Sequence, residues 1–140
     1  MATWDDVRSI ALALPEAVEE TSRRGTLSWS VRRKGFVWER PLGRAGTAEL
    51  GDAAPTGPVL AAMVDDLGVR QAWIQADPAV FFVIAHFAGY PAVLVRLDEI
   101  AVGTLREVVV EAWLAVAPKR LVDTFLAAGE HPDAVDDPGV

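Results

Sequence analysis

One stretch of alternating apolar and polar residues limits most tightly how this chain can fold. Apolar side chains occupy every second position of Leu27–Val31, and strand side chains point alternately to the two faces of a sheet. Arg32–Gly35 has the composition of a turn, in which Gly35 is expected to supply a positive φ, and Phe36–Trp38 resumes the apolar pattern. The stretch therefore predicts a β-hairpin with a basic tip, and Pro41 closes its second strand.

A second hairpin is expected later in the chain. Val80–His86 and Ala92–Leu97 are apolar runs of strand length, and Phe87–Gly89 between them predicts the turn that makes them antiparallel partners. Val59–Val64 is a further apolar run between Pro58 and Asp65, so it is also expected to be a strand.

Helices account for most of the remaining chain. Thr3 is expected to be an N-cap with Asp6 in a capping-box position, and Pro15 ends this first helix before an acidic connector at 16–20. Other helices are predicted at 67–76, with Asp66 as its N-cap, at 103–117 and at 119–127, the last with Pro118 as its first residue, and one helical turn at 44–50. Largely buried positions should include Leu14, Trp29, Val93, Val95 and Trp113. The fold class is therefore α+β: a single-domain sandwich of an antiparallel sheet with helices packed on one face.

Length and composition bound the organisation. The 140 residues suffice for one domain, expected at 1–127, and residues 128–140 read as an acidic, disordered tail with four carboxylates and no lysine or arginine. The chain has no cysteine, which removes disulfides, thiolate nucleophiles and zinc–thiolate sites. No apolar run is long enough to span a bilayer and the start lacks signal-peptide features, so a cytoplasmic location without membrane contact is expected.

Charge is distributed unevenly. The net charge of −7 argues against a nucleic-acid partner, because phosphate binding requires a basic surface. Between positions 23 and 44, however, seven basic residues face a single acid, Glu39. These candidate nucleic-acid-binding residues are Arg23, Arg24, Arg32, Arg33, Lys34, Arg40 and Arg44. The simpler interpretation, which we favour, is that they form a solvated hairpin surface.

Several segments, in their order, resemble the MmcQ/YjbR family. They are the helix end Leu14-Pro15-Glu16, the hairpin Trp29–Leu42, the segment His86–Ile100 and the segment Glu111–Val122. The resemblance implies a frataxin/CyaY-like, "double-wing" sandwich over residues 3–127. It also implies a DNA-binding label that rests on fold analogy, which is a weak warrant for function. No catalytic residues come with it.

Catalytic and cofactor motifs are missing from the sequence. None of the serines lies in a nucleophile elbow, no glycine-rich phosphate loop follows a strand, and His86 alone cannot form a zinc site. Asp5 and Asp6 are neighbours that point in different directions around a helix, and helix dipole effects explain acids at that position. We therefore assign no catalytic residue, no cofactor and no metal site, and an enzyme is the least favoured class.

A small-ligand site is the alternative to a DNA interface. Trp38, His86 and Tyr90 are candidates to rim a pocket between the sheet and the helices, with an arginine for an anionic or aromatic ligand. His86 could instead only stabilise its turn, and Trp29 and Trp38 could both pack under the helices. The sequence thus favours a non-enzymatic binding module. Its candidate partners are DNA, bound weakly and salt-dependently through the basic hairpin, or else a small molecule or protein held in a pocket.

Overall fold

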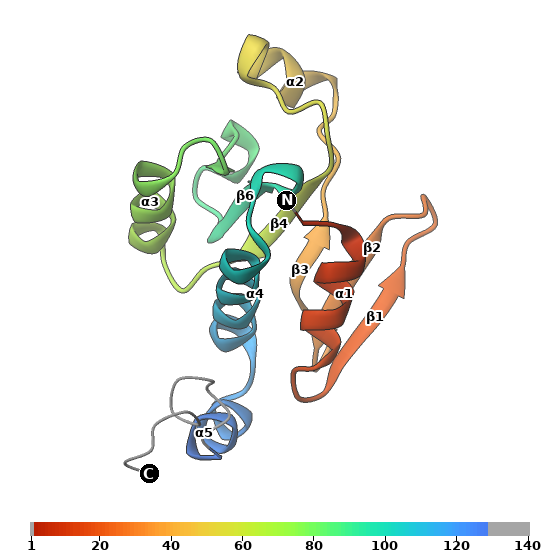
Figure 1. Ribbon diagram of the computed structural model, residues 1–140, viewed down its shortest axis with the longest axis vertical. Helices are drawn as coiled ribbons and strands as arrows, with labels where there is room; N and C mark the ends of the chain where they lie inside the picture. Colours follow the sequence, from red (N-terminus) through yellow and green to blue (C-terminus); the bar gives the residue numbers. More distant parts are fainter. Residues whose placement is uncertain (1, 129–140) are drawn as a thin grey trace.

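The computed structural model describes residues 2–128, which are organised around one six-stranded sheet (Figure 1). The strands lie in the order β1-β2-β3-β4-β6-β5, and all neighbouring pairs are antiparallel. The strands are β1 (Ala17–Thr21), β2 (Leu27–Val31), β3 (Lys34–Glu39), β4 (Val59–Met63), β5 (Phe81–Phe82) and β6 (Ala92–Arg96). The predicted α+β fold with an antiparallel sheet is confirmed.

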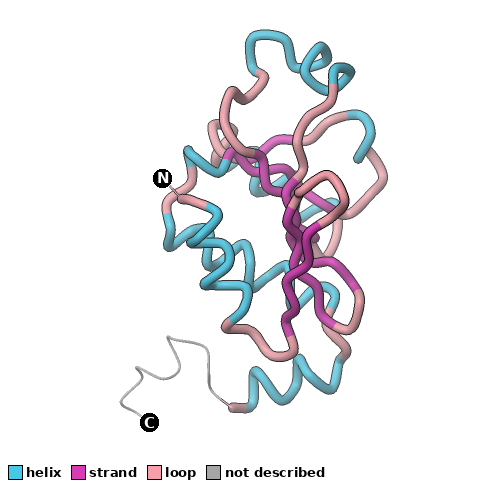
Figure 2. The backbone as a smooth tube through the Cα atoms, turned by 90° about the vertical axis from the view of Figure 1, so that its right-hand side faces the viewer, coloured by secondary structure: helices cyan, strands magenta, loops and turns pink. Residues whose placement is uncertain are grey.

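Helices cover one face of this sheet. The helices are α1 (Trp4–Leu12), α2 (Arg44–Leu50), α3 (Leu67–Ala76), α4 (Val102–Val116) and α5 (Lys119–Ala127), with short 3₁₀ turns η1 (Gly51–Ala53), η2 (Ala85–Phe87) and η3 (Leu97–Glu99). Figure 2 shows α1 and α4 together on one side of the strands. The short α2 stands away from them at the end of the sheet (Figure 1).

The first helix begins as its sequence predicts. The Thr3 side chain accepts a hydrogen bond from the Asp6 backbone N–H, and the Asp6 carboxylate accepts one from the Thr3 N–H. This reciprocal capping satisfies two backbone donors that would otherwise be unpaired. Helix α3 likewise begins at the predicted N-cap, Asp66, whereas Pro118 is the N-cap of α5 rather than its first residue.

The prediction of an acidic connector at 16–20 was wrong, because most of this segment belongs to the edge strand β1. The three glutamates obscured the strand pattern, but two of them have partners. Glu16 pairs with Arg32 of the neighbouring hairpin, and Glu19 lies partly buried against Arg8 and the indole of Trp29. Charged residues are common on edge strands, where they discourage pairing with other chains.

The basic hairpin has a shorter turn than expected, because the second strand begins at Lys34 and not at Phe36. Arg32 and Arg33 have φ values of 50° and 71°, so these two residues, and not Gly35, take the left-handed conformation. Positive φ at both central positions is the conformation of a type I′ turn, which suits a two-residue connection between twisted strands. The register shifts at Trp29–Ser30, so that Phe36 and Val37 both reach the same core.

The strand expected at 80–86 is shorter than the sequence suggested. Only Phe81–Phe82 pairs with β6, and the chain then turns into η2. The Ala85 N–H donates to the carboxylate of Glu49 in α2, which takes that donor out of the sheet. His86 therefore lies in a 3₁₀ turn and not at a strand end.

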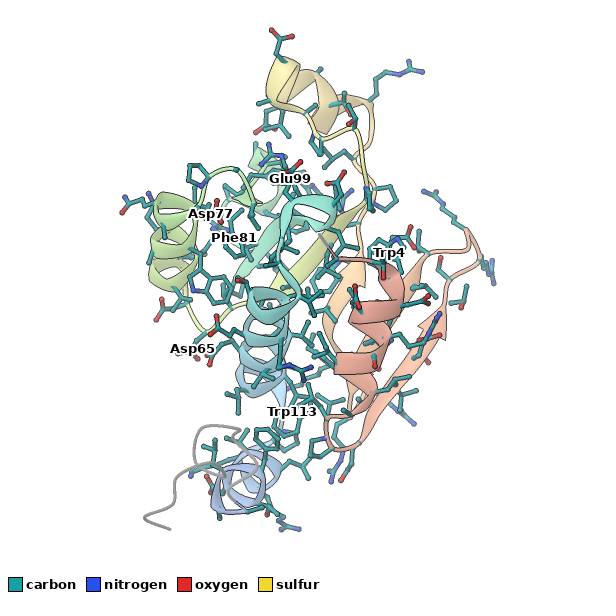
Figure 3. All side chains as sticks on the ribbon, viewed as in Figure 1. Trp4, Asp65, Asp77, Phe81, Glu99 and Trp113 are labelled. Atoms are coloured by element: carbon teal, nitrogen blue, oxygen red, sulfur yellow. The ribbon has the colours of Figure 1, made fainter. Side chains whose placement is uncertain are left out.

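The two faces of the sheet bury different clusters. The larger cluster lies under α1, α3 and α4 and contains all five residues predicted to be buried: Leu14, Trp29, Val93, Val95 and Trp113. Figure 3 shows Trp113 where α4 approaches α5, and its ring packs on Phe125 with centroids 5.1 Å apart. The smaller cluster, on the other face, includes Ala61, Phe82 and Leu94. The disordered tail predicted at 128–140 lies, apart from Ala128, outside the described residues.

Candidate ligand-binding site

A hollow of about 310 Å³ brings together all three predicted ligand-binding residues. It is lined by Trp38, Arg40, His86, Phe87 and Tyr90, and we call it the aromatic hollow. Phe87 belongs to the smaller cluster and Trp38 packs against it, so the hollow lies on the sheet face opposite α1 and α4. The pocket expected between sheet and helices is therefore on the other side of the sheet.

Strand alternation places the side chains of the two hairpin tryptophans on opposite faces of the sheet. Trp29 pairs with Val37 and is completely buried under the helices. Trp38 follows Val37 and points to the opposite face, beside the small side chain of Ala61 on β4. Of the two positions that the sequence left open, Trp29 takes the one under the helices and Trp38 takes the one at the hollow.

The η2 turn supplies the other wall of the hollow. Phe87 is buried beneath it, with its ring centroid 5.7 Å from that of His86 and 5.8 Å from that of Tyr90 in an edge-to-face arrangement. Tyr90 is 48% exposed at the rim. The anchoring role of Phe87 was not predicted, although its position between His86 and Tyr90 in the same turn was the available signal.

Arg40 is the cation of the hollow. Its guanidinium lies 5.5 Å from the centroid of the Phe87 ring, and Nη1 donates to the carbonyl of Pro41. The sequence assigned Arg40 to the basic DNA-binding set. The structure instead brings this arginine to the aromatic residues, where a guanidinium can meet an anionic group beside a stacking surface.

The seven basic residues predicted to bind DNA do not gather at one place. Arg32, Arg33 and Lys34 lie at one end of β2, and the loop with Arg23 and Arg24 lies at the other end. A strand of this length spans about 17 Å. Arg40 and Arg44 follow the end of β3 next to that loop, where the Leu27 N–H donates to Glu39. The seven residues therefore divide into two groups, three at the hairpin tip and four at the opposite end.

One member of the tip group is paired with an acid. The Arg32 guanidinium forms a two-point contact with the carboxylate of Glu16. This hydrogen bond with Arg32 holds the pKa of Glu16 below its ordinary value. The pair leaves Arg33 and Lys34 as the cations of the tip that have no carboxylate within 4.0 Å among the described residues.

Acids of the first helix and first strand have structural roles. Asp6 caps α1, and Asp5 and Glu19 both bind the guanidinium of Arg8. The hydrogen bond from Arg8 holds the pKa of Glu19 below its ordinary value, and a further hydrogen bond from Trp29 acts in the same direction. Within residues 2–128, no three acidic or histidine side chains gather as metal ligands would.

Comparison with known proteins identifies the family. A family model described as YjbR matches residues 12–115. The chain belongs to the YjbR family. The resemblance noted in the sequence is thus confirmed, and the match covers β1–β6 together with both walls of the aromatic hollow.

Two mycobacterial relatives of this YjbR-family chain are both named as uncharacterized proteins. Uncharacterized protein Rv2570 of Mycobacterium tuberculosis is 47% identical over 130 residues, which are 91% of this chain and 98% of the relative. Uncharacterized protein Mb2600 of Mycobacterium bovis matches to the same extent. The crystal structure of Deinococcus radiodurans protein DR2400, named for a DUF419 domain, superposes with a TM-score of 0.62 at 22% identity. That superposition covers 83% of this chain and 79% of the other, and it shows that the fold is shared.

No helix within residues 2–128 is both long enough and apolar enough to cross a membrane.

Proposed function

We propose that this YjbR-family domain is a non-enzymatic binding module and that the aromatic hollow binds a small, planar, negatively charged molecule. The observation that carries the proposal is the convergence of Trp38, Arg40 and the η2 turn on one hollow. Its volume of about 310 Å³ lies at the lower end of the range of small-molecule sites. A single aromatic ring with one anionic group fits that size.

The chemistry of the lining favours this ligand class. Trp38 and Tyr90 offer ring surface for stacking, and the guanidinium of Arg40 offers paired N–H donors that match a carboxylate or phosphate. No carboxylate side chain lines the hollow among the described residues. A ligand anion would therefore meet an arginine without an adjacent competing acid at the lining.

A DNA interface through the hairpin is the second candidate, and the arrangement of charges favours it less. A duplex requires cations in a continuous row along its phosphates, whereas the seven basic residues lie in two separated groups. Arg32 would also have to leave Glu16 to contact a phosphate.

The test of the ligand proposal compares three probes that separate ring from charge. Phenyl phosphate carries both, phenol carries the ring alone, and inorganic phosphate carries the charge alone. We expect phenyl phosphate to shift the backbone amide and indole NMR signals of Trp38 and residues 85–90, with an affinity at least tenfold higher than either partial probe.

Two variants locate the site. Arg40→Met should abolish the preference for phenyl phosphate over phenol, because it removes the guanidinium and keeps an apolar stem. Arg33→Met is the matched control, since it removes an exposed arginine at the hairpin tip and should bind like the parent protein. Equal affinity for all three probes, or an equal loss in both variants, would contradict the proposal.

A further inference from the structure

Arg70 is an unusual residue in the middle of α3. It is only 8% exposed, and it is the one charged residue that is buried within residues 2–128. Among the described residues, no carboxylate lies within 4.0 Å of its guanidinium. A buried charge without a counter-ion is costly unless hydrogen bonds replace its hydration.

Backbone carbonyls provide those hydrogen bonds. Nη1 donates to the carbonyls of Phe87 at 2.8 Å, Tyr90 at 2.9 Å and Ala92 at 3.1 Å, and Nη2 donates to that of Ala88 at 2.8 Å. All four acceptors belong to the segment that leaves η2 and enters β6. The guanidinium is thus the centre around which this turn is folded.

The two ends of the segment are held by opposite charges. At its start, the Ala85 N–H donates to both carboxylate oxygens of Glu49, at 3.2 and 2.9 Å. At its far end, the guanidinium of Arg70 donates hydrogen bonds to the four backbone carbonyls. A carboxylate therefore meets the N–H groups and a guanidinium meets the C=O groups, which is the favourable orientation for each.

Arginine suits the position of residue 70 better than lysine does. Its planar guanidinium has five N–H donors that spread in several directions, whereas lysine offers three donors on one nitrogen atom. Nη1 serves three of the four carbonyls and Nη2 serves that of Ala88, so a single ammonium nitrogen in the place of Nη1 would lose the contact with Ala88.

We propose that Arg70 is a positioning residue of the aromatic hollow: it fixes the 87–92 turn so that Phe87 and Tyr90 face Trp38 and Arg40. Arg70 does not line the hollow and acts through the backbone that it holds. Its positive charge, which has no carboxylate counter-ion among the described residues, lies directly behind that wall and adds to the preference for an anion. The part of this inference that concerns ligands rests on the proposed function, and the part that concerns the turn does not.

Arg96 provides a matched control. This arginine also donates to two backbone carbonyls, those of Ala53 and Pro78, and lies 4.4 Å from the centroid of the Phe82 ring. It joins the region after α2 to the segment before β5 and contacts neither the 87–92 turn nor the lining of the hollow. Arg96→Met therefore removes an equivalent backbone clamp at a different place.

The experiment compares Arg70→Met, Arg70→Lys and Arg96→Met with the parent protein. Amide hydrogen exchange and NMR shifts of residues 85–92 report on the turn, and titration with phenyl phosphate reports on the site. In Arg70→Met we expect at least tenfold faster exchange confined to the turn and at least tenfold weaker probe binding. Arg96→Met should leave both readouts within twofold of the parent protein.

Arg70→Lys separates position from charge and remains informative if the methionine variant does not fold. If positioning dominates, the lysine variant loses at least five-fold in probe affinity and its turn exchanges faster, although the charge is kept. Parent-like turn signals and affinity in Arg70→Lys would overturn the positioning role. Equal effects on the turn in Arg96→Met would overturn it as well.

Failure of the proposed function has a different signature. If the parent protein does not bind phenyl phosphate, the hollow is not a site for planar anions. Hydrogen exchange in the turn would still show whether Arg70 holds it.

Discussion

Two tryptophans on neighbouring strands, Trp29 and Trp38, have opposite surroundings. Trp29 is completely buried under α1 and α4, and its indole N–H is bound to Glu19. Trp38 is partly exposed and lines the aromatic hollow. The difference teaches that the face under α1 and α4, the closed face, encloses its tryptophan completely, whereas the opposite face, the open face, has a smaller core and leaves the ring of Trp38 partly exposed.

The largest expected effect comes from the closed face. Trp29→Ala should lower the free energy of unfolding by about 3–5 kcal/mol, because it leaves a large cavity in a close-packed core. Urea denaturation followed by circular dichroism measures the change. A loss below about 1 kcal/mol would mean that the helix-covered face tolerates cavities and that the contrast between the faces is false.

The matching substitution on the open face should behave differently. Trp38→Ala should cost about 1 kcal/mol of stability, the typical value for a point substitution, since solvent already reaches part of the side chain. Its main consequence should be the loss of phenyl phosphate binding, measured by NMR titration. If Trp38→Ala destabilises the protein as much as Trp29→Ala, the open face is a second closed core and not a site.

We expect Glu19, on the closed face, to make the stability of the folded state sensitive to acid. The folded state lowers the pKa of Glu19, chiefly through the hydrogen bond from Arg8, so ionised Glu19 favours folding. This contribution is present above the unfolded-state pKa of about 4.3, and it is lost as the pH falls through the lower folded-state value.

Glu19→Gln should therefore reduce stability near neutral pH and flatten the decline in stability on the acid side, as measured by thermal denaturation from pH 7 to 3. Glu20→Gln, a substitution of the exposed neighbour on β1, is the control and should retain the parent profile. A parent-like acid decline in Glu19→Gln would remove Glu19 from this role.

The sequence predicted much of this fold and only part of the site. Alternation in Leu27–Val31 and the caps at Thr3 and Asp66 are local signals, and each was confirmed. The strand β1 was missed because Glu19 within it and Glu16 just before it are satisfied by Arg8, Trp29 and Arg32, which are distant in sequence.

The site shows the same division between local and distant information. His86, Phe87 and Tyr90 share one turn, so their proximity is visible in the sequence. Their meeting with Trp38 and Arg40 depends on β4 lying between β3 and β6, which no local pattern specifies. The backbone clamp by Arg70 was not predictable, because an arginine in a short helix ordinarily indicates an exposed surface.

The smallest effect on stability is expected at the hairpin tip, between the two faces. Arg33→Ala/Lys34→Ala should leave stability nearly unchanged, because both side chains are exposed. In fluorescence anisotropy with a generic DNA duplex, we expect the parent protein to bind weakly and this binding to disappear as salt rises to physiological levels.

The matched control for the tip is Arg23→Ala/Arg24→Ala at the other end of β2. Equal weakening in the two double variants would indicate a diffuse charge effect. Loss of binding in the tip variant alone would favour a DNA-contacting wing and would move the function away from the open face.

The hydrogen bond from the Trp113 indole to the carbonyl of Pro15 joins positions 98 residues apart. Such a contact closes only after nearly the whole domain has left the ribosome, which adds roughly 5–20 residues each second. The β1–β4 meander and the packing of α1 on β1 and β2 can form from neighbouring segments, whereas docking of α4 on this layer must wait until that helix has been synthesised. For several seconds of synthesis the part of this sheet face that α4 covers, on β3 and β4, is therefore exposed to solvent.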